Sequence, residues 1–263
     1  MNAIVDEMNP EDHPKCIFTT EDEPKNTRDF YFLESADKIQ FFYEEGVFNE
    51  DGELTVEKGK AFNKVGHALH WLNPVFKKYT FHQNIKNIAR QLEMKQPQIV
   101  QSMYIFKQPN YGGAVSEHVD STFLKIEPTN KLLGVWIAVD DASIENGCLW
   151  FIPGSHKNHE LNYHFVRSNS DSDDPYEPLL EYVGEKPIYD SEKFIPVPVP
   201  RGSLVLIDPL VVHKSERNVS KLSRHAYSFH IADKYESQWS PLNWLQETST
   251  YKFPNLLNND SLV

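Results

Sequence analysis

The chain has few cysteines, no long apolar run and no excess of positive charge. Its two cysteines, Cys16 and Cys148, are too few and too far apart for the disulfide framework of a small secreted domain. The longest apolar run, residues 132–139, is much shorter than the roughly 20 residues of a membrane-spanning helix. Residues 1–10 contain no apolar stretch of the kind found in signal peptides. We therefore expect no membrane span and a cytoplasmic location.

Acidic residues outnumber basic ones. The chain has 38 Asp and Glu against 26 Lys and Arg, a formal net charge of −12. Because a nucleic-acid-binding surface is usually basic, we expect no nucleic acid partner. The 263 residues include 16 Phe, 12 Tyr and 5 Trp, enough apolar surface for a substantial core. We expect residues 1–263 to form a single domain that acts as a monomer.

The first third of the chain is predicted to contain helical segments and one strand. Residues 3–8 have the pattern of the end of a helix, and residues 63–72 and 85–92 carry apolar side chains at helical spacing. Residues 37–43 are predicted to form a strand, followed by a turn at residues 49–52.

From residue 98 the pattern changes to short β-rich runs separated by clusters of Gly, Pro, Asn and Asp. The predicted strands cover residues 98–106, 132–140, 148–152, 194–199, 203–207 and 225–232. Helices followed by many short strands predict an α+β fold that is mainly β, with helices backing an antiparallel barrel or sandwich. The polar insertion at residues 162–193 is predicted to be a mobile loop near a binding site.

Three residues have the identities of ligands in an iron site. His118 and Asp120 form a His-x-Asp pair, and side chains two apart in an extended segment point to the same side. His213 supplies a second imidazole. Two imidazoles and one carboxylate bind one face of Fe(II) and leave the opposite face open to other ligands.

Arg224 follows this set and precedes the last predicted strand. A guanidinium that points into a barrel needs an anion, because an unpaired buried charge is costly. Its planar fork suits a carboxylate. Together the four residues indicate an oxygenase that uses Fe(II) and 2-oxoglutarate. His230 lies on the same face of the strand, and we expect it to be a hydrogen-bonding core residue rather than a further ligand.

Other histidines are predicted to have structural or solvated positions. His67 and His70 are spaced to share a metal on one helix face. Because no carboxylate partner is evident, we expect both to be solvated helix residues. His156 follows Pro153-Gly154-Ser155 and is expected to stabilise a turn.

The segments around these residues resemble the phytanoyl-CoA dioxygenase family. The matching stretches are Gln101-Ser102-Met103-Tyr104, His118-Val119-Asp120, and residues 134–139, 146–156, 213–220 and 223–230. The resemblance covers nearly the whole chain from Asp29 onward. It implies a double-stranded β-helix core of the cupin or jelly-roll type. Members of the family begin with a further helical segment, most of which this chain lacks, so we expect its N-terminal helix to be truncated.

The resemblance also implies roles for individual residues. It assigns His118, Asp120 and His213 to the iron, and Arg224 with Ser215 to the distal carboxylate of 2-oxoglutarate. Further positions that line the cosubstrate pocket in the family match Lys64, Met103 and Trp136. Without the resemblance, Lys64 would be predicted to be a solvated residue at a helix start, and the other two would be predicted to lie in the core.

The implied reaction is the oxidation of a small or lipid-like substrate by O₂, with conversion of 2-oxoglutarate to succinate and CO₂. One alternative is a non-catalytic barrel protein that binds a metal or 2-oxoglutarate. Another is a cupin isomerase or dioxygenase that does not use 2-oxoglutarate. The complete ligand set favours catalysis over the first, and Arg224 and Lys64 disfavour the second. The sequence identifies no particular substrate.

Overall fold

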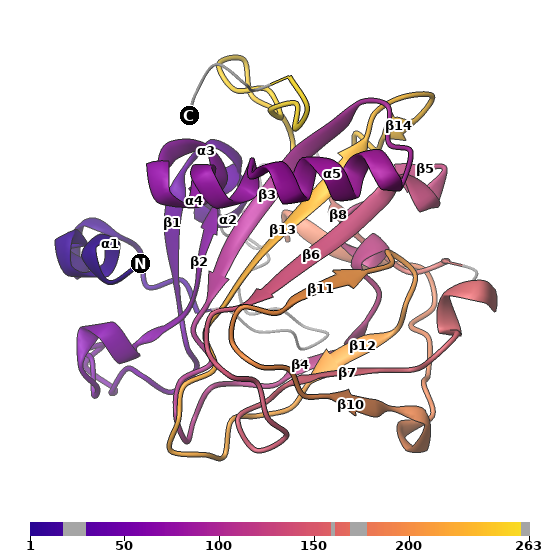
Figure 1. Ribbon diagram of the computed structural model, residues 1–263. Helices are drawn as coiled ribbons and strands as arrows, with labels where there is room; N and C mark the ends of the chain where they lie inside the picture. Colours follow the sequence, from indigo (N-terminus) through magenta and orange to yellow (C-terminus); the bar gives the residue numbers. More distant parts are fainter. Residues whose placement is uncertain (18–29, 159–160, 169–177, 259–263) are drawn as a thin grey trace.

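The computed structural model describes residues 1–17, 30–158, 161–168 and 178–258. Within them, the strands that pair are antiparallel and form two main sheets (Figure 1). The six-stranded sheet contains β1 (Ile39–Tyr43), β2 (Phe62–His67), β3 (Pro97–Ile105), β13 (Ala226–Asp233), β6 (Leu132–Ala138) and β11 (Leu204–Ile207), in that order. The four-stranded sheet contains β10 (Ile195–Val197), β7 (Leu149–Phe151), β12 (His213–Ser215) and β4 (Val115–His118).

Two shorter pairs and a few helices complete the described structure. The pairs are β5 (Ile126–Glu127) with β14 (Gln238–Trp239), and β8 (His164–Arg167) with β9 (Leu180–Val183). The α-helices are α1 (Asn2–Glu7), α2 (Phe30–Leu33), α3 (Leu69–Leu72), α4 (Pro74–Thr80) and α5 (Gln83–Gln91). Two facing antiparallel sheets with helical support confirm the prediction of a mainly β, jelly-roll core.

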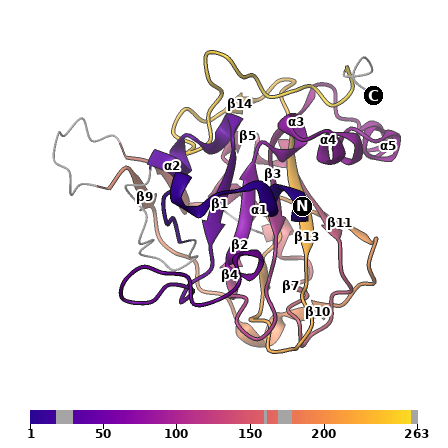
Figure 2. The ribbon, with the colours of Figure 1, turned by 90° about the vertical axis from the view of Figure 1, so that its left-hand side faces the viewer.

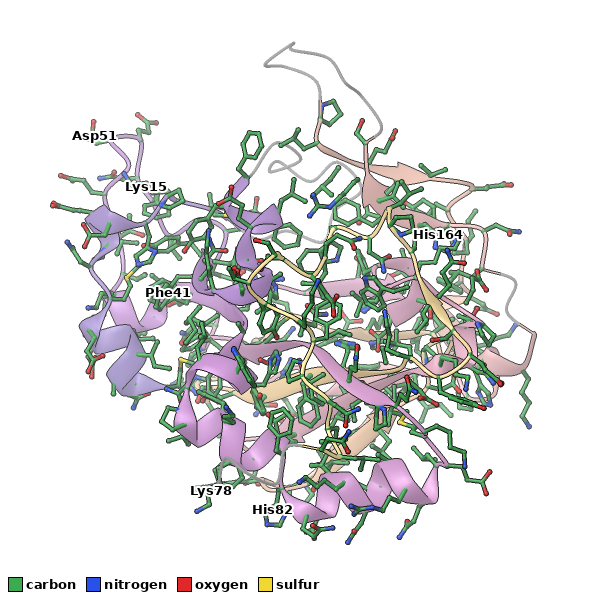
Figure 3. The ribbon with its side chains drawn as sticks, turned by 90° about the horizontal axis from the view of Figure 1, so that it is seen from above. Lys15, Phe41, Asp51, Lys78, His82 and His164 are labelled. Carbon is green, nitrogen blue, oxygen red and sulfur yellow. The ribbon has the colours of Figure 1, made fainter. Side chains whose placement is uncertain are left out.

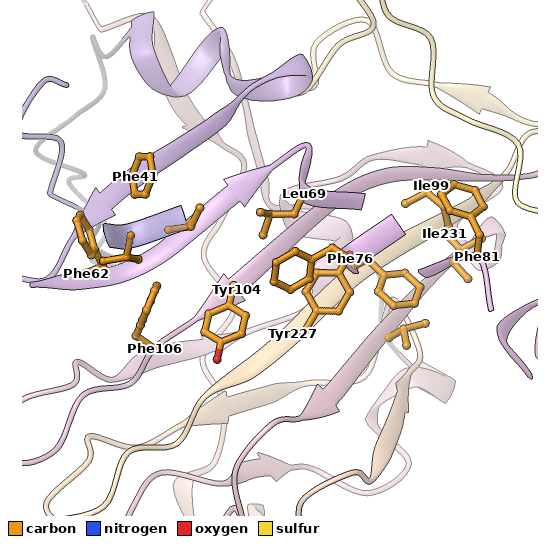
Figure 4. Packing of buried hydrophobic residues seen from close by; sticks show 14 of the residues in the cluster. Phe41, Phe62, Leu69, Phe76, Phe81, Ile99, Tyr104, Phe106, Tyr227 and Ile231 are labelled. Carbon is orange, nitrogen blue, oxygen red and sulfur yellow. The ribbon is translucent and has the colours of Figure 1, made fainter. Parts of the chain in front are cut away.

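Helices α3, α4 and α5 cover the outer face of the six-stranded sheet (Figures 1 and 2). Pro74 stands at the first position of α4, and the Asn73 side chain accepts hydrogen bonds from two backbone N–H groups of its first turn. The buried side of these helices packs against aromatic and aliphatic side chains of β3 and β13 (Figure 4). Lys78 and His82 point away from the sheet and are exposed (Figure 3).

Strand β13 lies in the middle of this sheet and is buried on both faces. Because side chains alternate along a strand, Tyr227, Phe229 and Ile231 face the helices. The Tyr227 hydroxyl also hydrogen-bonds to Thr80 on α4, at 2.6 Å. The other face of the strand points into the space between the two sheets.

Most predicted strands from residue 97 onward are confirmed to within about two residues, as are the helix at residues 85–92 and the turn at residues 49–52. The helix predicted over residues 63–72 is wrong. Residues 62–67 form β2, which pairs with β1 and β3, and only residues 69–72 are helical. Val65 and Leu69 have helical spacing but lie on different elements. Strand β2 lies between two other strands and does not show the usual alternation of apolar and polar residues, because the polar residues Lys64 and His67 are buried as well.

The prediction that His67 and His70 are solvated is also wrong, since both are fully buried. The His67 Nδ1 lies 2.6 Å from the Ser35 hydroxyl. The His70 ring bridges the hydroxyls of Ser102 and Tyr251, each at 2.9 Å. Burial lowers the pKa of His70 to about 3, so the ring is neutral at neutral pH.

The insertion at residues 162–193 differs from the predicted loop in its described part. Strands β8 and β9 form a hairpin in it, and Phe165, Val166 and Leu180 are buried. The polar composition of the insertion concealed these few apolar residues. Residues 169–177, which belong to the predicted mobile segment, lie outside the described residues.

Replacing Leu69 by Ala tests the packing of helices on the sheet. Leu69 is fully buried, so the substitution should lower the free energy of unfolding by about 2–5 kcal/mol. Leu72→Ala on the same helix is the matched control, because Leu72 is 50% exposed and should change stability by about 0.5 kcal/mol or less. Urea unfolding followed by circular dichroism measures both. Equal losses in the two variants would contradict this packing.

Candidate metal and cosubstrate site

A cavity of about 220 Å³ lies between the two sheets. Its wall contains every residue predicted for the site: Lys64, Met103, His118, Asp120, Trp136, His213, Ser215 and Arg224. These residues come from both sheets and from the segments that follow β4 and precede β13. The fold therefore brings them together around one space, which is the arrangement that their predicted roles require.

The three predicted metal ligands meet where β4 pairs with β12. His118 is the last residue of β4, and His213 lies opposite it as the first residue of β12. Asp120 begins the short 3-10 helix that follows β4. One ligand atom from each of the three residues lies within 4.8 Å of the others. This grouping is tight enough for all three to bind one ion.

Backbone carbonyl groups fix the tautomers of both imidazoles. The Nδ1 of His118 lies 2.7 Å from the Ser116 oxygen, and the Nδ1 of His213 lies 3.1 Å from the Val211 oxygen. A carbonyl oxygen only accepts hydrogen bonds, so Nδ1 carries the proton in each neutral ring. The Nε2 lone pairs remain available, and these atoms lie 3.8 Å and 3.6 Å from Asp120 Oδ1.

The protonation states also suit a metal. Burial, together with the neighbouring His213, lowers the pKa of His118 to about 4. Burial alone would raise the pKa of Asp120, but the surrounding His230, His213 and His118 lower it below its ordinary range. Because His118 is neutral at neutral pH, its approach to Asp120 is not an ion pair, although the distance alone would allow one. A neutral imidazole and an ionised carboxylate are the forms that bind divalent cations.

Arg224 lies behind this group and is only 1% exposed. Its Nε donates to the Gly147 oxygen at 2.9 Å, and its Nη2 donates to the Ser215 hydroxyl at 3.0 Å. Its Nη1 is buried and has no hydrogen-bond partner among the described residues. Burial lowers the pKa of Arg224 to about 10, which leaves the guanidinium charged at neutral pH. A buried cationic donor without a partner is the feature expected of an anion site.

Trp136, Met103 and Lys64 complete the wall near Arg224. The guanidinium carbon of Arg224 lies 5.4 Å from the Trp136 ring centre, within cation–π range. The Lys64 Nζ lies 4.0 Å from the Met103 sulfur. Lys64 thus lies on a strand and faces the cavity, rather than starting a helix in solvent. Burial lowers its pKa to about 7, and an anion in the cavity would favour its charged form.

The remaining wall is mainly aromatic and aliphatic. The β8–β9 hairpin contributes Phe165, Leu180 and Tyr182, and the segment after β14 contributes Trp244. His230 lies on the cavity face of β13, with its Nε2 3.2 Å from Asp120 Oδ2 and its Nδ1 3.2 Å from the Gln101 side chain. It is therefore a hydrogen-bonded core residue beside the ligand group. Sequence reasoning did not single out Gln101 and Gly134, although both lie in segments that carried the family resemblance.

In the part of the chain that the structure describes, every helix is too short or too polar to cross a membrane.

Comparisons with known proteins agree with the fold and identify the family. A model of the family described as "Phytanoyl-CoA dioxygenase (PhyH)" matches residues 16–226. A "Phytanoyl-CoA dioxygenase domain-containing protein 1 homolog" of Caenorhabditis briggsae is 57% identical over 97% of this chain and 88% of its own length. The "Phytanoyl-CoA dioxygenase domain-containing protein 1" of Rattus norvegicus is 49% identical over 97% of this chain and 87% of its own length.

Solved structures with low sequence identity share the fold. The non-heme alpha ketoglutarate dependent carbocyclase SnoK is 20% identical, with a TM-score of 0.54 over 90% of this chain and 88% of its own. The epimerase SnoN, in complex with Fe³⁺, alpha ketoglutarate and nogalamycin RO, is 17% identical, with a TM-score of 0.54 over 75% of this chain and 74% of its own. From the family model and the extent of identity with the animal relatives, the chain belongs to the phytanoyl-CoA dioxygenase family.

Proposed function

We propose that this protein is an Fe(II)- and 2-oxoglutarate-dependent dioxygenase that hydroxylates a small or lipid-like substrate. One observation carries the proposal. The buried Arg224, whose Nη1 has no hydrogen-bond partner among the described residues, lines the same cavity as the imidazoles of His118 and His213 and the carboxylate of Asp120. A metal site next to a cationic site that can bind a carboxylate fits a cosubstrate that contacts both. We propose that residues 1–263 form one oxygenase domain.

His118, Asp120 and His213 would hold the iron through two Nε2 atoms and one carboxylate oxygen. The donor set fits, since imidazole and carboxylate are the ligands of the non-heme Fe(II) facial triad. The backbone carbonyls that hold each Nδ1 proton also fix the ring orientation, as outer hydrogen bonds do in other metal sites.

Arg224 would bind the distal carboxylate of 2-oxoglutarate, with Ser215 beside it. The Ser215 hydroxyl donates to the Gly147 oxygen at 2.9 Å, so its lone pair is available to accept from Arg224. This arrangement holds the guanidinium plane in place before an anion binds. Lys64 adds a second positive charge, and Met103 and Trp136 supply apolar walls.

With iron, 2-oxoglutarate and O₂ bound, the chemistry supplied is oxidation of a substrate C–H bond, coupled to formation of succinate and CO₂. The chain itself binds and orients the reactants. Phe165, Leu180 and Trp244 keep water away from one side of the cavity, and a drier site strengthens the interaction of Arg224 with a carboxylate. The presence of Asp120 disfavours halogenation, which needs that coordination position for a halide.

Family membership and the iron- and alpha-ketoglutarate-bound neighbour support this reading. The non-catalytic binding protein remains the alternative and would use the same residues. The cytoplasmic location and the monomeric state remain predictions from the sequence.

Asp120→Ala should abolish the conversion of 2-oxoglutarate to succinate, because the iron would lose its only anionic protein ligand among the three. Succinate formed without added substrate, with Fe(II) and 2-oxoglutarate supplied, measures this. Glu192→Ala, an exposed acidic position, serves as the control and should keep the wild-type rate. A folded wild-type protein that binds both ligands but forms no succinate would favour the non-catalytic alternative.

Arg224→Lys should raise the concentration of 2-oxoglutarate needed for half-maximal succinate formation. Lysine offers a point charge where a planar fork is required. Weakening this buried, charge-assisted contact should cost about 2–4 kcal/mol, or about 30- to 1,000-fold in affinity. Arg217→Lys is the control, because Arg217 is exposed. An unchanged requirement in Arg224→Lys would mean that Arg224 has only a structural role.

A further inference from the structure

The two carboxylate oxygens of Asp120 have different surroundings. Oδ1 faces the Nε2 atoms of His118 and His213. Oδ2 is buried and faces the six-stranded sheet, where its nearest ionisable neighbour is the Nε2 of His230 at 3.2 Å. No described group makes a regular hydrogen bond to Oδ2, and the His230 ring is the nearest potential donor. One oxygen therefore faces the metal ligands, and the other faces the sheet.

The surface beneath Oδ2 is a row of three residues across the sheet. His230 on β13 pairs with Gly134 on β6 and with Gln101 on β3. A methyl group at position 134 would lie 2.7 Å from Asp120 Oδ2 and 3.0 Å from the Ile207 Cβ. The first contact is too short and the second is tight, so a side chain at position 134 would force the Asp120 carboxylate to shift.

Gln101 determines which nitrogen of His230 carries the proton. An ionised carboxylate only accepts hydrogen bonds, so the Nε2 facing Asp120 must carry a proton. In the neutral ring Nδ1 is then an acceptor, and the Gln101 amide nitrogen lies 3.2 Å from it as a donor. Gln101 and His230 are both buried, at 4% and 7% exposure, so their contact with bulk water is limited.

We propose that His230, oriented by Gln101 and placed opposite Gly134, is a positioning residue that holds Asp120 Oδ2 so that only Oδ1 binds the metal. This inference rests on the metal site of the proposed function. Its chemical consequence is that Asp120 occupies one coordination position rather than two. A bound ion would then keep more of its coordination positions free for a 2-oxo acid and O₂.

Two substitutions of His230 distinguish the effect of its N–H donor from the effect of the imidazole ring as a whole. The amide nitrogen of His230→Gln can reach the place of Nε2, whereas that of His230→Asn reaches only the place of Nδ1. Co(II) is the probe, because its visible absorption reports the number of ligands. His230→Asn should bind Co(II) about 10- to 100-fold more weakly, with a changed absorption spectrum. His230→Gln should restore most of the affinity and the wild-type spectrum.

Gly134→Ala tests the same position without touching His230. The added methyl group should displace Asp120 and weaken Co(II) binding in a protein that remains folded by circular dichroism. If His230→Asn fails to fold, Gly134→Ala still tests whether the position of Asp120 against the sheet controls metal binding. His70→Gln is the control for loss of a buried histidine, and it should lower the melting temperature without changing Co(II) affinity or spectrum.

Wild-type affinity and spectrum in folded His230→Asn or Gly134→Ala would overturn the positioning role while leaving the metal site intact. A loss that His230→Gln does not restore would also overturn it, because the N–H donor would then not be the operative group. Failure of the wild-type protein to bind Co(II) would instead overturn the metal site itself, and the positioning role with it.

Discussion

The rest of the structure depends on the central strand β13, because one of its faces packs against the helices and the other lines the cavity. Tyr227 and Phe229 hold the helices against one side of the sheet. Ser228 and His230 line the cavity on the other side. A slip of one residue in its pairing with β3 and β6 would exchange these faces, which would bury polar groups among aromatic rings. The packing of β13 against the helices therefore also fixes its register with β3 and β6, and so determines which side chains line the cavity.

The candidate site combines burial with fixed polar partners. Burial alone would raise the pKa of Asp120, yet the neighbouring histidines, His230 foremost, lower it. Backbone carbonyls determine the tautomers of the two predicted ligand histidines, so their orientation comes from the backbone and not from other side chains. Arg224 is similarly held by one carbonyl and one hydroxyl, with one nitrogen left over.

The candidate site could be predicted from the sequence better than the local structure around it. His118, Asp120, His213 and Arg224 have chemical identities that few other roles require together, and the structure places them around one cavity. The environment of Lys64 could not be predicted in this way. The apolar residues around it have helical spacing, but they belong to a strand and to the short helix that follows it. The burial of Lys64 results from pairing with β1 and β3, which are distant in sequence. The place of Gly134 beneath Asp120 depends on a contact between segments that local patterns do not report.

The short strand β12 carries His213 at its first residue and Ser215 at its last. A strand advances about 3.3 Å per residue, so two residues separate these side chains by about 7 Å along the backbone. The strand thus sets a fixed distance between the candidate metal ligand His213 and Ser215 beside the candidate anion site. A dicarboxylate of the wrong length would reach one end and leave the charge at the other unpaired. On the proposed function, the backbone would therefore select a cosubstrate by its length, whichever substrate is oxidised.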